Sequence, residues 1–96
     1  MQIERRIIES GLLSKGFVKE KTHHNYFHHM YQGKITGVYT YTSLGTNYKT
    51  YDAGLLNMIK KQLRLDRSKQ VVDLCKCPIT EDAYNQILID KGIFTP

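Results

Sequence analysis

Two adjacent segments of alternating pattern constrain the fold of this chain more than any other feature. Residues 23–31 and 34–43 are rich in aromatic and β-branched side chains, which favour strands. Between them, Gln32-Gly33 supplies a short turn that contains glycine. The sequence therefore predicts an antiparallel β-hairpin over these residues.

The alternation leaves open which face of this hairpin is buried. Neighbouring residues of a strand point to opposite faces, and both faces of the first predicted strand carry aromatic side chains. One face carries Tyr26, His28 and Met30, and the other carries Phe27, His29 and Tyr31.

Amphipathic helices flank the hairpin. Residues 2–14 and 52–64 carry apolar side chains at helical spacing, with charged side chains between them. Gly16 is a natural stop for the first helix, and residues 17–19 form a short additional strand candidate. The expected core is α-β-β-β-α, with a three-stranded antiparallel sheet and both helices packed on one face of it.

Two further helices are expected after this core. One spans residues 67–76 and is broken by Pro78, and the next begins at its cap, Thr80. Together they predict a C-terminal helical hairpin. We therefore expect an α+β core over residues 1–65 and a helical extension over residues 66–96 that packs on the same domain.

Composition sets the class of protein. The 96 residues are 41% hydrophobic and 24% charged, which is typical of one globular domain. No apolar run approaches the roughly 20 residues that span a membrane, and the charged N-terminus does not resemble a signal peptide. Cys75 and Cys77 are too close in sequence for an unstrained disulfide. These features predict a cytoplasmic protein with reduced cysteines and no membrane partner.

The positive charge is concentrated in the first two-thirds of the chain. The net charge is +5, and residues 1–70 hold 12 basic and 5 acidic side chains, whereas residues 71–96 hold 2 and 4. A basic surface of this kind attracts polyanions such as nucleic acids, with an ordinary solvated surface as the alternative.

All four histidines lie within the segment from His23 to His29. Histidine gains and loses a proton near neutral pH, which a metal-independent ribonuclease requires. A metal site is disfavoured, because His24 and His28 on one strand would lie roughly 13 Å apart at about 3.3 Å per residue. We therefore expect no metal and no cofactor. For each histidine other than His23, a place on the surface of a strand is the alternative.

Three motifs in the same order resemble those of the HicA-type (YcfA-like) mRNA interferase toxins. Thr22-His23-His24-Asn25-Tyr26-Phe27-His28 resembles the family's strand motif, in which His23 takes the position of the catalytic histidine. Leu12-Leu13-Ser14-Lys15-Gly16-Phe17 looks like the end of the family's first helix. The resemblance covers residues 4–65. Its third motif looks like the family's second helix and comprises Gly54, Leu56, Ile59, Lys61, Gln62 and Leu65.

The resemblance implies a fold and an activity. The fold would be similar to a double-stranded-RNA-binding domain, and the activity would be metal-independent endoribonuclease cleavage by transesterification. His23 would act as general base on the 2′-hydroxyl or as general acid on the leaving oxygen. RNA would be the substrate, and a HicB-like antitoxin protein would be the partner.

Basic and histidine side chains are the expected contacts to RNA. Tyr39 and Tyr41 could stack on bases or pack within the sheet. The alternative function is a non-catalytic RNA-binding or protein-interaction adaptor on the same fold. The candidate RNA-binding residues are Lys19, Lys21, His24, His28, Lys60, Lys61 and Arg64.

Overall fold

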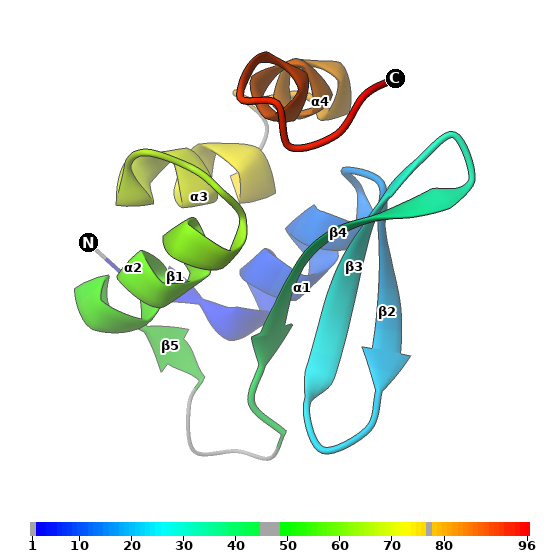
Figure 1. Cartoon of the computed structure of the whole chain (residues 1–96). Helices are drawn as coiled ribbons and strands as arrows, with labels where there is room; N and C mark the ends of the chain where they lie inside the picture. The colour runs from blue at the N-terminus through cyan, green and yellow to red at the C-terminus, as the bar shows by residue number, and fades with distance from the viewer. Residues whose placement is uncertain (1, 45–48, 77) are drawn as a thin grey trace.

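The computed structural model describes residues 2–44, 49–76 and 78–96. These residues form an α+β domain with four helices, a three-stranded antiparallel sheet and a separate two-stranded ribbon (Figure 1). The predicted α+β class is therefore confirmed. The elements are β1 (Ile3–Glu4), α1 (Arg5–Leu13), β2 (Phe17–Lys21), β3 (Asn25–Tyr31), β4 (Lys34–Thr42), β5 (Thr50–Tyr51), α2 (Ala53–Gln62), α3 (Ser68–Lys76) and α4 (Glu81–Asp90).

The predicted hairpin is present as β3 and β4. Gln32 and Gly33 connect the two strands and have φ angles of 51° and 79°. Positive φ at both central residues matches the twist of the strands that such a turn joins. The sheet has the order β2-β3-β4, with both neighbouring pairs antiparallel.

The first strand of the hairpin is shorter than predicted, and the correction affects the histidines. We expected a strand over residues 23–31, but β3 begins at Asn25, and His23 and His24 lie in the turn between β2 and β3. Lys21 pairs directly with Asn25, so the residues between them must reverse the chain. The Thr22 N–H donates to the His24 carbonyl at 3.0 Å and closes this turn.

The structure settles which face of the sheet is buried. Helices α1 and α2 pack on the face that carries Phe27 and Val38, which are 0% and 2% exposed (Figure 1). Helix side chains accept hydrogen bonds from the polar groups of this inner face. The pairs are Glu9 of α1 with Asn25 and Thr42, Gln62 of α2 with Thr40, and Asn85 of α4 with His29.

A short ribbon that the sequence did not predict brings the starts of α1 and α2 together. Strand β1 pairs antiparallel with β5, and Ile3 lies opposite Tyr51. Each strand has two residues, and the helices begin within two residues of their ends. A pairing this short leaves no alternation in the sequence, so periodicity could not reveal it.

The C-terminal helices share the core with the rest of the chain. Helix α3 packs on α1 and α2. From α4, Tyr84 is fully buried and stacks on Phe17 of β2 with ring centroids 5.8 Å apart. After α4, Phe94 packs on Tyr31, so the end of the chain lies beside the β3–β4 hairpin. In the part of the chain that the structure describes, no helix has the length and apolar character to cross a membrane.

Candidate functional site

The outer face of the sheet, opposite α1 and α2, carries four aromatic rings, and a fifth ring from the β2–β3 turn adjoins them. Tyr26 lies directly opposite Tyr41 in the pairing of β3 with β4, and His28 lies directly opposite Tyr39. Tyr39 is 46% exposed, and the other rings are half-buried. We call this surface the aromatic face, and it comprises His24, Tyr26, His28, Tyr39 and Tyr41.

The rings of the aromatic face contact one another in an unbroken series. His24 stacks on Tyr41 with centroids 4.9 Å apart, and Tyr41 lies 5.7 Å from Tyr26. Tyr26 and His28 are 6.2 Å apart and almost parallel, and His28 lies 5.8 Å from Tyr39. Mutual packing restricts the rings before any ligand arrives, which favours stacking on flat partners such as nucleobases.

Two of the predicted RNA-binding cations lie beside the aromatic face. Lys61 and Arg64 line a shallow pocket of about 270 Å³ together with Tyr39, Gly37 and Gln62. Lys61 lies in the last turn of α2, which packs against β4, and Arg64 follows the end of this helix. A ring exposed on the sheet and two cations at its edge form the pairing of stacking and phosphate contacts that single-stranded nucleic acids require.

Arg64 is held in place by an unusual helix end. The N–H groups of Arg64 and Leu65 donate to the carbonyls of Lys61 and Lys60 at 3.2 and 2.9 Å, which is a Schellman cap. In this cap, Arg64 is the residue after the helix end that adopts the left-handed conformation, with φ 63°. The same motif ends α4, but there Gly92 takes this position with φ 74°.

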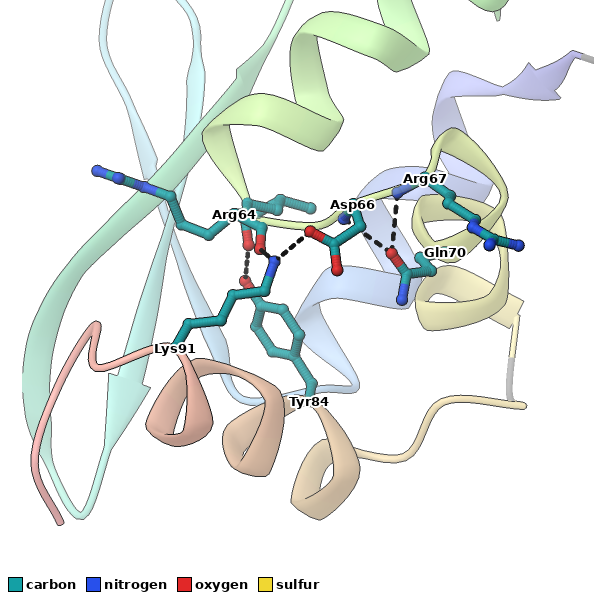
Figure 2. Close-up of polar contacts among 7 residues, drawn as sticks. Arg64, Asp66, Arg67, Gln70, Tyr84 and Lys91 are labelled. Carbon is teal, nitrogen blue, oxygen red and sulfur yellow. Dashed lines mark hydrogen bonds and ion pairs between the residues drawn. The ribbon is translucent and has the colours of Figure 1, made fainter.

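Side chains from α4 and its C-cap fix the backbone around Arg64. Lys91 Nζ donates to the Arg64 carbonyl and to Asp66 Oδ1, both at 2.7 Å, and Tyr84 Oη donates to the Leu63 carbonyl at 2.8 Å. The hydrogen bond from Lys91 lowers the pKa of Asp66. Figure 2 shows the guanidinium of Arg64 pointing away from this cluster, towards the sheet, whereas Arg67 lies on the opposite side.

The remaining predicted RNA-binding lysines do not lie on the aromatic face. Lys19 and Lys21 are exposed on edge strand β2, but they pair with inner-face residues of β3, so their side chains project from the opposite side of the sheet. Lys60 is half-buried on α2, and its charge acts on Asp66 in the α2–α3 loop.

His23 is exposed at the tip of the turn that precedes the aromatic face. Among the described residues, no hydrogen bond or ion pair holds its side chain. Its neighbour His24 is held by stacking on Tyr41. The structure therefore places His23 next to the aromatic face without fixing its ring.

His29 is buried and belongs to the core, although the sequence gave it a surface alternative. Its Nε2–H donates to Asn85 Oδ1 at 2.8 Å, and Thr36 Oγ1 lies 2.9 Å from its Nδ1. Phe17 and Tyr84 pack against the ring. Burial lowers the pKa of His29, so the ring is held neutral. Phe27 and His29 are two residues apart on β3 and share a face, so the sequence would have predicted the burial of His29 if the buried face had been known.

Protonation of His29 is expected to destabilise the fold. Its pKa lies below the 6.5 of the unfolded chain, so stability is complete above pH 6.5 and falls as the pH drops from there to the folded pKa. Urea unfolding from about pH 7.5 to 5 should show this loss. His29→Gln should remove this part of the pH dependence while lowering stability at every pH. An unchanged pH slope in that variant would contradict the assignment.

The cysteine region offers no reactive thiol among the described residues. Cys75 is a free, buried thiol on α3, and burial raises its pKa to about 12. Cys77, the other residue of the expected reduced pair, lies outside the described residues. Within the described ranges, no group of three or more His, Cys, Asp or Glu side chains is arranged to hold a metal ion.

Comparison with known proteins adds no further assignment. No protein family, no curated protein and no solved structure matches the chain. The chemistry of the aromatic face and its neighbouring cations is therefore the basis for a functional proposal.

Proposed function

We propose that this protein binds single-stranded RNA on the aromatic face. The observation that carries the proposal is the contact series from His24 to Tyr39, with Lys61 and Arg64 beside its last ring. The order α-β-β-β-α with helices on one face also supports a fold like that of double-stranded-RNA-binding domains. In this proposal the outer face of the sheet is the RNA-binding surface.

Stacking favours unpaired bases over a duplex. Every nucleobase has a flat face, and stacking on an aromatic side chain contributes about 1–3 kcal/mol per base. In an A-form duplex the base faces are already stacked, and the edges lie in grooves that a flat sheet does not enter. Single-stranded segments expose both the base faces and the phosphates that Lys61 and Arg64 can neutralise.

The backbone of Arg64 supports the same proposal. A left-handed conformation costs a residue with a side chain about 1–2 kcal/mol, and glycine avoids this cost. Gly92 occupies the equivalent position at the end of α4. Arg64 keeps this strained conformation at the edge of the aromatic face, which supports a role for its guanidinium in binding RNA.

Arg64→Gly is expected to separate stability from binding. Relief of the left-handed strain should raise the unfolding free energy by about 1 kcal/mol. Loss of the guanidinium should weaken binding of a short labelled single-stranded RNA and flatten the slope of log K against log salt by about 0.7, the value for one phosphate contact. Fluorescence anisotropy at several salt concentrations and thermal unfolding measure the two effects.

Arg67→Gly is the matched control, because it removes the same charge on the opposite side of the loop (Figure 2). It should leave the salt slope close to that of the wild type. Equal losses of binding in the two variants would show that only net charge matters. Absence of any salt-sensitive RNA binding by the wild type would overturn the proposed function.

RNA cleavage is a second candidate function, and the place of His23 favours it. An exposed imidazole beside the aromatic face could reach the 2′-hydroxyl or the leaving oxygen of a bound strand. Incubation with RNA in EDTA should then give cleavage that His23→Ala slows by about 10²-fold, since proton transfer contributes about 10²–10⁴-fold. Binding should remain. Full activity of His23→Ala would remove this histidine from the mechanism.

A further inference from the structure

The aromatic face has a carboxylate at its β2 edge. Glu20 pairs directly with Tyr26 in the antiparallel sheet, so the two side chains lie on the same face. Its Oε1 lies 3.2 Å from Nε2 of His28, and its side chain is 62% exposed. Glu20 is therefore oriented by one ring of the aromatic face, stands beside another and remains accessible to a ligand.

A carboxylate at this position cannot bind the phosphate groups of RNA. Its negative charge repels the RNA backbone, and it offers only acceptors. On a surface that stacks bases, the groups it can bind are the N–H donors on the edges of those bases. Hydrogen bonds to an ionised carboxylate are about twice as strong as neutral ones, so Glu20 can discriminate among bases.

Guanine has the edge that matches a carboxylate best. Its N1–H and N2–H donors are adjacent and point the same way, so the two carboxylate oxygens can accept both. Adenine and cytosine each place an acceptor nitrogen beside their single amino group, and uracil places its one N–H between two carbonyls. Those acceptor atoms repel the carboxylate oxygens, so adenine, cytosine and uracil cannot donate two hydrogen bonds to the carboxylate at once.

We infer that Glu20 makes the aromatic face selective for guanine in single-stranded RNA, by accepting hydrogen bonds from a base stacked at Tyr26 and His28. This inference rests on the proposed function. Besides stacking on the base, His28 orients Glu20, because its Nε2 contacts Oε1 at the edge of the ring series.

The test compares short uridine-rich oligonucleotides that differ only in one central base. Their riboses carry 2′-O-methyl groups, which block cleavage and isolate binding. By anisotropy, the wild type should bind the central guanine about tenfold more tightly than adenine, cytosine or uracil, as a good bidentate contact allows. Inosine, which lacks the 2-amino group, should fall between guanine and the others.

Glu20→Gln and Glu20→Ala should reduce the guanine preference to about twofold or less, because neither offers two charged acceptors. Glu4→Gln removes the same charge from an exposed position on β1 and should shift all oligonucleotides equally. Equal wild-type affinity for all central bases, or a preference retained in both Glu20 variants, would overturn the inference alone. No binding of any oligonucleotide would overturn the proposed function and the inference with it.

Discussion

Gly11→Ala is expected to destabilise the domain by about 2 kcal/mol, because a steric clash that costs about 3 kcal/mol, at the upper end for overpacking a core, exceeds the gain in helix propensity. A Cβ atom added at Gly11 would lie 2.3 Å from the carbonyl oxygen and 2.5 Å from the Cα atom of Cys75. These are backbone atoms of α3, so no side-chain rotation can relieve the clash. Helices α1 and α3 would have to separate, and Leu12, Leu74 and Cys75, all buried at their contact, would lose packing.

This steric cost exceeds the benefit of the substitution. Alanine favours a helix interior over glycine by about 1 kcal/mol, which only partly offsets the clash. For a domain of this size, a net loss of about 2 kcal/mol lowers Tm by about 10 °C. Thermal unfolding followed by circular dichroism measures the change.

Gly54→Ala provides the matched control. Gly54 also lies in a helix, but the nearest atom to its added Cβ is the Asp52 Oδ1 atom at 3.5 Å, an ordinary contact. This variant should be as stable as the wild type or more stable. Equal stability of the Gly11 and Gly54 variants would show that α1 and α3 are not packed as closely as the structure indicates.

The sequence predicted the elements whose pattern extends over several residues. The apolar stripe of α2 and the cap at Thr80 follow from spacing and from local hydrogen bonding, and both lie where expected. The hairpin followed from its alternation and its Gln32-Gly33 turn. Local patterns are sufficient for these features because their causes are local.

Features that depend on distant contacts could not be predicted. Lys15 looks like a solvated helix-end lysine, yet it is buried and donates to the carbonyls of Leu74 and Ile79 at 2.6 Å. Its environment is created by the end of α3, more than fifty residues away in sequence. The burial of His29 against Asn85 has the same kind of cause.

The candidate site was predicted in part. Histidine chemistry and basic charge drew attention to the segment that contributes His24, Tyr26 and His28 to the aromatic face, and stacking was one alternative considered for Tyr39 and Tyr41. The aromatic face itself could not be recognised, because both faces of the hairpin carry rings. Only the packing of the helices on Phe27 and Val38 decides which rings remain accessible.

Replacing Tyr26 and Tyr39 together by alanine is expected to weaken single-stranded RNA binding by about 10³-fold. Each stacked ring contributes about 2 kcal/mol, and about 1.4 kcal/mol corresponds to a tenfold change. The two residues lie on adjacent strands with ring centroids 6.2 Å apart, and their loss removes the central and the last ring of the contact series. Anisotropy with a labelled single-stranded RNA measures the loss.

The corresponding double replacement by phenylalanine distinguishes stacking from hydrogen bonding. Phenylalanine keeps both rings and removes only the hydroxyl groups, so binding should stay close to that of the wild type. Thermal unfolding of both variants checks that the sheet is intact, which is expected because both side chains lie on the outer face. If the alanine variant folds and still binds RNA as tightly as the wild type, the aromatic face is not the binding surface. Any remaining RNA binding would then have to occur on another part of the protein surface.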